Sequence, residues 1–171
     1  MPTRPFEARR RILATLSSLL FIAITQNAGN CDTPQSIRQQ LADKYAAMDV
    51  AFRDRDVDAA LAFYSPKCRF VDNGDTMSLA QERKLADRQL RHAVSAQSQT
   101  QVISFSLSGS TATVVETQLL HETDKQNGKP LIVEERERSR DTWLRNKNGW
   151  QIDETVTLSE ETFVDGKRYK R

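Results

Sequence analysis

Cysteine, histidine, proline and glycine are all scarce in this chain of 171 residues. There are two cysteines, two histidines, five prolines and six glycines. Cys31 and Cys68 have no histidine at ligand spacing near them, so they indicate no metal site, and no glycine-rich phosphate loop is present. In an oxidising compartment the two thiols pair, or Cys68 stays buried as a small apolar side chain. The sequence therefore predicts neither a metal nor another cofactor.

Neither sign of charge is in large excess. The 25 basic and 23 acidic residues give a formal net charge of +2. Residues 1–28 hold four arginines and one glutamate, which leaves 21 basic and 22 acidic residues in the rest of the chain. A nucleic-acid-binding domain needs a clustered basic face. Nothing in the sequence indicates such a face, so we expect no nucleic-acid partner.

No apolar run reaches the length of an ordinary membrane span, which is about 20 residues. The run from Ile12 to Ile24 (ILATLSSLLFIAI) has thirteen residues and follows Arg9-Arg10-Arg11. A basic start, an apolar middle and a small polar end are typical of a secretory signal. We therefore expect residues 1–30 to be a signal peptide and the mature domain to be periplasmic or secreted, without membrane attachment. An uncleaved anchor and a lipidated Cys31 are the alternatives.

The first part of the expected domain has helical periodicity. A capping threonine followed by proline predicts a helix over about 34–54. Asp56 caps a second, shorter helix, and a capping box at Ser78–Gln81 opens a third over about 79–96. Between the second and third helices, Cys68–Asp72 alternate as a short strand. The apolar stripe of the first helix consists of Ile37, Leu41, Tyr45, Met48 and Phe52.

From Ser98 onward the period of the apolar residues falls to two. Four strands follow one another, joined by hairpin signals, as in an antiparallel meander. Helices segregated from an antiparallel sheet make an α+β fold. We expect the N-terminal helices to pack in the concave face of a strongly curved antiparallel sheet. Trp143 and Trp150 flank the last hairpin, where they are expected to fix the register and fill one end of the core.

Four motifs resemble the nuclear transport factor 2-like (NTF2-like) superfamily. They are Asp56–Tyr64 (DVDAALAFY), Arg69–Asp72 (RFVD), Asp141–Arg145 (DTWLR) and Gly149–Ile152 (GWQI). The chain looks most similar to the branch of SnoaL-like proteins and the domain-of-unknown-function 4440 group, over about residues 35–158. The resemblance implies a cystatin-like cone fold for residues 31–160, with 161–171 as a polar tail that adds an edge hairpin or frays. Because the superfamily contains isomerases, cyclases, dehydratases, ligand binders and interaction modules, it implies no single activity.

Asp72 is the candidate general base that the resemblance implies. It falls where ketosteroid isomerases of the superfamily keep their proton-shuttling aspartate, and a carboxylate in an apolar pocket becomes a usable base. Val71 and Asn73 depart from the isomerase pattern, which has an acidic residue before the aspartate and proline after it. Tyr45 is the candidate for placing the substrate, although its spacing to the next helix differs from that of the isomerases. The alternative is that Asp72 caps the turn that follows it.

Glutamate and arginine alternate from Glu134 to Asp141. Strand alternation puts Glu135, Glu137 and Asp141 on the same side as Trp143. Glu154 joins them from the next strand, which predicts an acidic pocket mouth. The alternatives are a solvated strand with cross-strand ion pairs, or a bulge that changes the alternation. The complete set of expected pocket residues is Tyr45, Met48, Phe52, Phe63, Phe70, Asp72, Glu135, Asp141, Trp143 and Glu154.

Three functions are compatible with these features. The first is the binding of a small, largely apolar molecule in the cone of an exported protein. The second is a small enzyme of the isomerase, dehydratase or cyclase type that uses Asp72 as general base. The third is an interaction module whose exposed sheet face pairs two copies or docks a partner. We expect the first function, together with a homodimer through the sheet.

Overall fold

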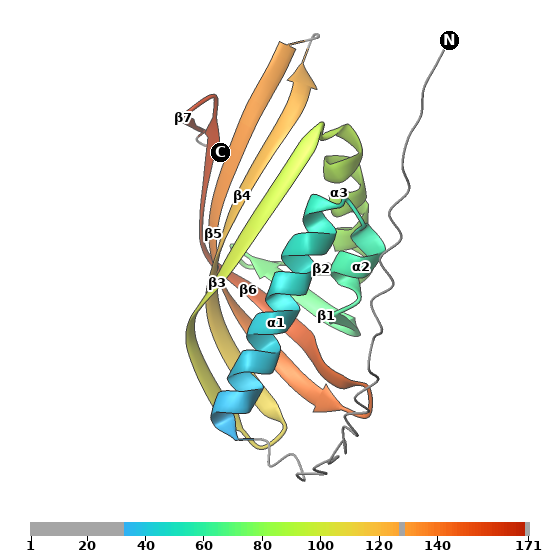
Figure 1. The fold of residues 1–171 in the computed structure, drawn as a ribbon, viewed down its shortest axis with the longest axis vertical. Coiled ribbons are helices and arrows are strands. Elements are labelled where there is room, and N and C mark those ends of the chain that lie inside the picture. The colour runs from blue at the N-terminus through green and yellow to red at the C-terminus, as the bar shows by residue number, and fades with distance from the viewer. Residues whose placement is uncertain (1–32, 127–128, 170–171) are drawn as a thin grey trace, which may run out of the picture. The chain divides into compact units, whose positions relative to one another are not determined.

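The computed structural model describes residues 33–126 and 129–169, so the expected signal peptide at residues 1–30 lies outside the described residues. These ranges hold three helices and seven strands (Figure 1). The helices are α1 (Pro34–Arg53), α2 (Val57–Leu61) and α3 (Leu79–His92). The strands are β1 (Tyr64–Asp72), β2 (Asp75–Ser78), β3 (Ser95–Ser108), β4 (Thr111–Gln126), β5 (Lys129–Asn146), β6 (Gly149–Val164) and β7 (Lys167–Tyr169). Among these helices, none combines the length and apolar character that a membrane crossing requires.

All seven strands belong to one sheet. Its order is β2-β1-β6-β5-β4-β3, and β7 pairs with β6 near the C-terminal end of that strand. Strands β3 to β6 form the expected antiparallel meander. However, β1 runs parallel to β6, so the sheet is mixed, and the expectation of a wholly antiparallel sheet is wrong in this detail. A parallel pair needs a long connection, and here α3 and the meander supply it.

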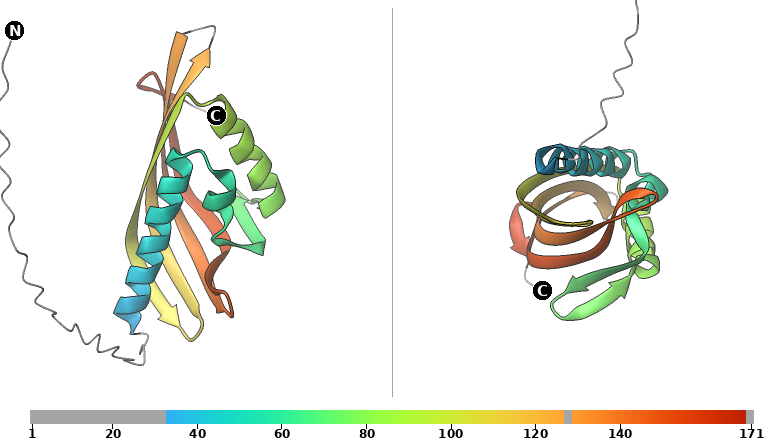
Figure 2. Two further views of the ribbon diagram at one scale, coloured as in Figure 1. Left: turned by 45° about the vertical axis from the view of Figure 1, so that its right-hand side comes forward. Right: turned by 90° about the horizontal axis from the view of Figure 1, so that it is seen from below.

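The long strands of the meander curl strongly. Seen from below, they bend into an incomplete ring with α1 along one side (Figure 2). β6 carries two bulges against β5, at Asp153 and Leu158, and bulges bend a strand and increase its twist. We call the side of the sheet that carries Ala112, Val114 and Trp143 the inner face, because these residues are buried against α1, and the other side the outer face.

α1 begins at the predicted residue and buries the predicted stripe. The Thr33 side chain accepts a hydrogen bond from the backbone N–H of Ser36 at 3.1 Å, and proline occupies the first helical position. Ile37, Leu41 and Tyr45 are buried in the main core. This packing places Tyr45 against the inner face of the sheet.

α3 begins at the predicted capping box but ends earlier than expected. The Ser78 side chain accepts from the Gln81 backbone, and the Gln81 side chain accepts from the Ser78 backbone. The helix stops at His92, and not near residue 96, because Ala93 has an extended backbone and the chain then enters β3. Glu82, in the first turn of α3, points toward the inner face, where the Glu137 charge reaches it.

β1 is longer than the predicted strand, and β2 is an unexpected addition. The second helix ends at Leu61, so Tyr64 belongs to the strand. Asn73 and Gly74 both have positive φ, at 50° and 90°. Such a pair fits a two-residue hairpin turn, which here places Asp75 opposite Asp72.

Trp143 and Trp150 are both buried in the main core. Trp143 is fully buried and Trp150 is 3% exposed. Trp143 lies opposite Ile152 in the β5–β6 pair, and Trp150 lies two residues before Ile152 on the same face. Both pack with Leu41 of α1. The predicted structural role of this hairpin is therefore confirmed.

The expected polar tail contributes to the sheet. β6 continues to Val164 and remains paired with β5 over its last residues. A turn at Asp165-Gly166 then leads into β7, which pairs with β6. Of the two alternatives for this segment, the edge hairpin is the one that forms.

Candidate functional site

A buried hydrogen-bonded chain links α1 to β5 on the inner face. The Tyr45 hydroxyl donates to Oδ2 of Asp141 at 2.6 Å and accepts from Nε1 of Trp143 at 2.9 Å. The two rings meet edge to face, with centroids 5.4 Å apart and planes at 82°. β5 supplies both partners because Asp141 and Trp143 are two residues apart and share one face.

Asp141 is an acidic group in an apolar setting. Its residue surface is 3% exposed, and its Oδ1 atom has no hydrogen-bond partner among the described residues. Burial raises its pKa to about 6, although the hydroxyl groups of Tyr45 and Thr155 act in the opposite direction. Thr155 lies opposite Asp141 in the β5–β6 pair. Asp141 is therefore mainly ionised at pH 7 but takes up a proton in mildly acidic solution.

Glu116 is a second buried carboxyl group beside Asp141. It lies on β4 opposite Ser139. Val114, two residues earlier on the same face of β4, lies opposite Asp141. It is 7% exposed, and its Oε2 atom is unpartnered within the described part of the chain. Burial raises its pKa to about 9, and the charges of Asp141, Glu137 and Asp49 add to the shift. Glu116 therefore carries a proton at pH 7.

Glu137 extends this acidic group along β5. Its Oε1 atom accepts a hydrogen bond from Thr157 of β6 at 3.0 Å and another from Ser139. Glu82 of α3 also belongs here, because burial and then the Glu137 charge raise its pKa. Four carboxyl groups from three elements therefore converge on one region, which we call the acidic cluster. Its members are Glu82, Glu116, Glu137 and Asp141.

Apolar and aromatic side chains complete the wall around the acidic cluster. The rings of Tyr64 and Phe70 lie 5.1 Å apart between centroids. Cys68 is 2% exposed, and burial raises its pKa to about 12, so the thiol stays neutral and is a poor nucleophile. In the described residues, no group of three or more histidine, cysteine or acidic side chains is placed to hold a metal ion.

The structure brings several of the predicted pocket residues together. Tyr45, Asp141 and Trp143 are in direct contact through the hydrogen bonds described above. The partly buried residues that pack against the same core include Met48, Phe63 and Phe70. Phe52 lies elsewhere, against a second small core formed by Leu90, Ala93 and Ala96.

Glu154 does not join the acidic cluster. The bulge at Asp153 shifts the alternation of β6 by one residue, so that Thr155 lies opposite Asp141 on the inner face. Glu154 instead forms an ion pair with the exposed Arg69 of β1 at 2.6 Å. Glu135 lies farther along β5, opposite Thr162, and is half-buried.

Asp72 lies at the rim of the site. It is the last residue of β1 and accepts a hydrogen bond from the Asn73 side chain at 3.1 Å. It lines a hollow of about 520 Å³ together with Thr157 and Glu160 of β6 and with β7. The carboxyl group that pairs with Tyr45 is that of Asp141, on a different strand.

Glu116 and Glu82 were not among the expected site residues. Strand alternation does place Glu137 on the side of Trp143, although the expected set of pocket residues does not include it. Glu116 follows Ala112 and Val114 at every second position of β4, and these three residues are buried. Strand alternation is therefore the signal that identifies Glu116. No comparable signal exists for Glu82, because α3 is polar on most sides and only the fold turns this residue inward.

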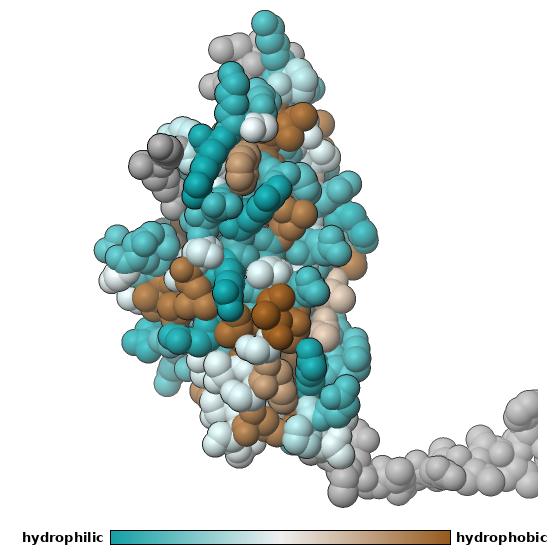
Figure 3. Space-filling model, turned by 90° about the vertical axis from the view of Figure 1, so that its left-hand side faces the viewer, coloured by the Kyte–Doolittle hydropathy of each residue, from teal (hydrophilic) through white to brown (hydrophobic). Residues whose placement is uncertain are grey.

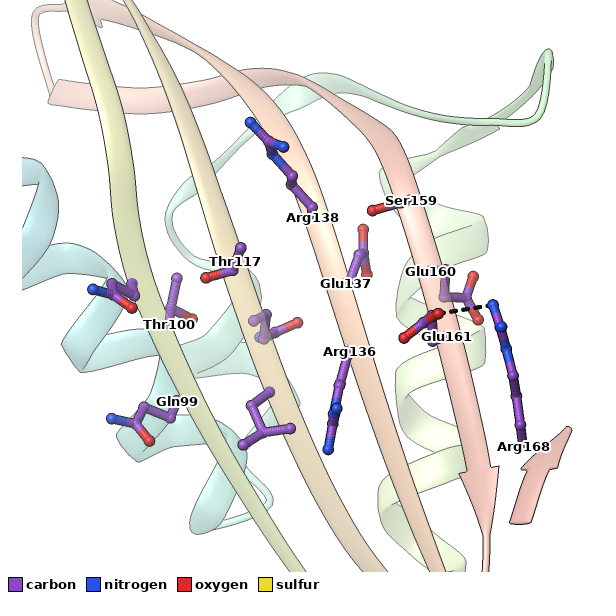
Figure 4. Close-up of a pocket in the computed structure, with 13 residues that line it drawn as sticks. Gln99, Thr100, Thr117, Arg136, Glu137, Arg138, Ser159, Glu160, Glu161 and Arg168 are labelled. Atoms are coloured by element: carbon purple, nitrogen blue, oxygen red, sulfur yellow. Dashed lines mark ion pairs between the residues drawn. The ribbon is translucent and has the colours of Figure 1, made fainter. Parts of the chain in front are cut away.

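The outer face holds a separate hollow of about 920 Å³ (Figure 4). Arg136 and Arg138 of β5 line it, and Arg168 of β7 forms an ion pair with Glu161 at 2.8 Å. Figure 3 shows this side of the molecule, where hydrophilic side chains surround smaller hydrophobic areas. The exposed Ile132 and Leu158 are among the outward apolar residues.

Comparisons with known proteins identify the fold. No protein-family model matches the chain, and no curated protein matches its sequence. A dehydratase candidate of the NTF2-like family from Streptomyces avermitilis has a TM-score of 0.61 at 15% identity, covering 74% of this chain and 100% of that one. A scytalone dehydratase candidate from Novosphingobium aromaticivorans has a TM-score of 0.62 at 10% identity, covering 74% and 88%.

A third solved structure carries the same architecture. This domain of unknown function with a cystatin-like fold, from Nostoc punctiforme, has a TM-score of 0.55 at 11% identity and covers 73% of this chain and 78% of that one. Placement in the SnoaL-like and domain-of-unknown-function 4440 branch stays a prediction. Likeness at such identities extends to the fold, and the chain has the cone-shaped fold seen in these NTF2-like and cystatin-like structures.

Proposed function

We propose that the protein binds a small molecule inside the cone, against the hydrogen-bonded chain of Trp143, Tyr45 and Asp141. The observation that carries this proposal is the pair of buried, unpartnered oxygen atoms, Oδ1 of Asp141 and Oε2 of Glu116. Buried polar atoms in native proteins nearly always have partners. A ligand that donates hydrogen bonds to these atoms would supply them.

The surroundings favour a ligand with an apolar body and at least one polar group. Aromatic side chains line the wall, and carboxyl groups lie within it. A hollow of about 360 Å³ between α1 and β3 reaches Tyr45 and is also lined by Arg38 and Val102. Val102 lies directly opposite Glu116 in the β3–β4 pair. This volume lies at the small end of the range for ligand sites, roughly 300–1,000 Å³.

Acid–base catalysis is the second candidate function. Two neighbouring carboxyl groups whose pKa values are pushed apart, to about 6 for Asp141 and about 9 for Glu116, can divide the roles of base and acid. Asp141 would accept a proton from the substrate, and the protonated Glu116 would donate one. Asp72 at the rim remains the base that the sequence resemblance implies. Two of the structural neighbours are dehydratase candidates, which supports this alternative.

Native mass spectrometry of the full chain, purified gently from its own host, tests the proposal. We expect a complex heavier than the bare polypeptide that loses its extra mass on denaturation. Tyr45→Phe should reduce the bound fraction, because the hydroxyl that orients Asp141 is lost. A bare protein from several growth conditions would contradict the proposed function.

The two candidate functions differ in their response to Asp141→Asn. If the site is catalytic, the variant should lower turnover of the identified molecule by roughly 10²–10⁴-fold and change its affinity little. If the site only binds, the wild-type protein should return the molecule unchanged, and the variant should change affinity alone. Product analysis by chromatography distinguishes these results.

Export to the periplasm or beyond, and pairing of two copies through the outer face, remain proposals that rest on the sequence. Protease protection in intact cells would test export, since a periplasmic protein becomes accessible only when the outer barrier is opened.

A further inference from the structure

Within the described part of the chain, no buried basic residue accompanies Glu116 and Asp141, the two most buried members of the acidic cluster. Every buried charged residue in the described part of the chain is acidic, namely Glu116, Glu122 and Asp141. No lysine, arginine or histidine in the same ranges is buried. The charges that act on Glu116 come from Asp141, Glu137 and Asp49, all of them carboxylates. Glu116 is protonated at pH 7, but Asp141 is mainly ionised there, and a buried charge in a protein is normally paired.

The basic side chains nearest in sequence lie outside and have other partners. Arg136 is exposed and pairs with Glu134 at 2.6 Å, and Arg69 pairs with Glu154. Lys44 of α1 lies over the ring of Phe63. These three basic groups are therefore engaged with partners outside Asp141 and Glu116, while Arg38 lines the hollow beside Tyr45 and Arg138 shares the outer hollow with Glu137.

The unpartnered oxygens add a second, independent observation. Glu116 and Asp141 are both more than nine-tenths buried, and each retains one oxygen atom without a donor in the described residues. Tyr45 and Thr157 already supply hydroxyl donors to other oxygens of the group, and the hydroxyl of Thr155 also acts on Asp141. What the site still lacks is a set of donors that also carries positive charge.

We infer that the molecule bound in the cone carries a protonated amine, which the carboxyl groups of Asp141, Glu116 and Glu137 receive. This inference rests on the proposed function and names the ligand class of that same site. An alkylammonium group has three N–H donors and one positive charge, which matches unpartnered oxygens on neighbouring strands. Its apolar body would lie along the aromatic side chains, where a cation also gains from an aromatic ring face.

Three probes that share one ring test the charge preference directly. Benzylamine is a cation at pH 7, benzyl alcohol is its neutral counterpart, and benzoate is an anion of similar size. Each is titrated into the full chain while the indole N–H resonances of the two tryptophans are followed by ¹H–¹⁵N NMR. Trp143 reports on the site because its N–H donates to Tyr45, and a Trp150→Phe sample assigns the two signals.

We expect benzylamine to bind about tenfold or more tightly than benzyl alcohol, and benzoate to bind least. Asp141→Asn keeps the shape and the acceptor for Tyr45 but removes the charge, so benzylamine affinity should fall about fivefold or more while benzyl alcohol affinity stays within about twofold. Glu137→Gln should act in the same direction, and it serves as the second variant if Asp141→Asn does not fold.

Glu122→Gln is the matched control. Glu122 is another buried glutamate on the same face of β4, with an unpartnered oxygen of its own, but it lies opposite Val133, away from the acidic cluster. This variant should leave the affinities of all three probes unchanged.

The outcomes separate this inference from the function on which it rests. Tighter binding of benzyl alcohol or benzoate than of benzylamine would overturn the inference and leave a binding site in place. An equal loss of affinity for benzylamine and benzyl alcohol in Asp141→Asn would also overturn it, because it would mean a structural effect. If none of the three probes shifts the Trp143 resonance, the inference of an amine ligand is contradicted. If native mass spectrometry also finds the protein without a bound molecule, the proposed function is contradicted as well.

Discussion

Tyr45 is the residue on which the buried network depends. Its single hydroxyl group donates a hydrogen bond to the Asp141 carboxylate and accepts one from the Trp143 indole N–H. One oxygen atom therefore provides the hydrogen-bond partner of both buried groups. Burial and the neighbouring Asp141 charge raise the pKa of the phenol far above its ordinary value, so it remains a donor at any physiological pH. The helix stripe places this residue, and β5 supplies both partners.

Tyr45→Phe should therefore destabilise the protein. It leaves the Trp143 N–H group without an acceptor and Asp141 without its donor, which costs about 1–3 kcal/mol for a buried polar group. Urea unfolding followed by tryptophan fluorescence measures the loss. Tyr169→Phe is the control, because Tyr169 is 60% exposed and should change stability by less than about 0.5 kcal/mol. Equal stability of the two variants would contradict the role assigned to the Tyr45 hydroxyl.

The raised pKa of Glu116 predicts a pH dependence of stability. A carboxyl group whose pKa is higher in the folded state holds its proton more tightly there, so its contribution is fully present below the unfolded pKa and is lost as pH rises toward the folded pKa of about 9. Asp141 acts mainly below pH 6 because its folded pKa is about 6. The wild-type protein should therefore lose unfolding free energy between pH 6 and pH 8.

Glu116→Gln should flatten this decline, because the amide carries no proton to lose. The difference between the two slopes is at most about 1.4 kcal/mol per pH unit for a single group. Chemical unfolding at pH 6, 7 and 8 measures both slopes. Parallel curves for the two proteins would mean that Glu116 is not protonated in the folded state.

Among the elements, the β5–β6 hairpin holds the largest buried side chains. Trp150→Ala removes a side chain that is 3% exposed and packed in the main core, and it should lower the unfolding free energy by about 3–5 kcal/mol. Trp150→Phe keeps a large apolar ring and should lose clearly less. A loss below about 1 kcal/mol for the alanine variant would contradict the structural role of the hairpin.

Truncating the C-terminal hairpin tests how much β7 and the end of β6 contribute to the stability of the protein. The three residues of β7 are all exposed, so a chain that ends after Val164 should lose less than about 1 kcal/mol. A chain that ends after Leu158 lacks the part of β6 that pairs with Val133 to Arg138 of β5, and it should unfold at a markedly lower temperature. Thermal unfolding by circular dichroism compares the two, and equal melting temperatures would contradict the contribution of this segment.

For the whole molecule, the sequence predicts a homodimer through the outer face. Leu119 is half-buried and lines the hollow on that face, so Leu119→Glu should convert the dimer to a monomer in light scattering. Ser106→Glu adds the same charge to an exposed residue of β3 outside the hollow, and it should leave the dimer intact. A monomeric wild-type protein, or dissociation by both variants, would contradict pairing through this hollow.

Part of the candidate site could be predicted from local patterns. Helical spacing puts Tyr45 on the buried stripe of α1, and strand alternation puts Asp141 beside Trp143. Alternation failed for Glu154, because the bulge at Asp153 leaves no clear signal in the sequence and reverses the faces of the residues up to the second bulge at Leu158. The hydrogen bond between Tyr45 and Asp141 joins residues far apart in the chain, so neither pattern could predict it.

The sequence by itself determined the elements, the α+β class and the resemblance to the cone fold, because caps, turns and periodicity are local properties. Only the tertiary structure decided that β1 lies parallel to β6 and that four carboxyl groups from three elements meet in one place. Those facts depend on how the long strands curl and where the bulges fall. Burial then sets the protonation of Glu116 and Asp141, since desolvation exists only after the chain has closed around them.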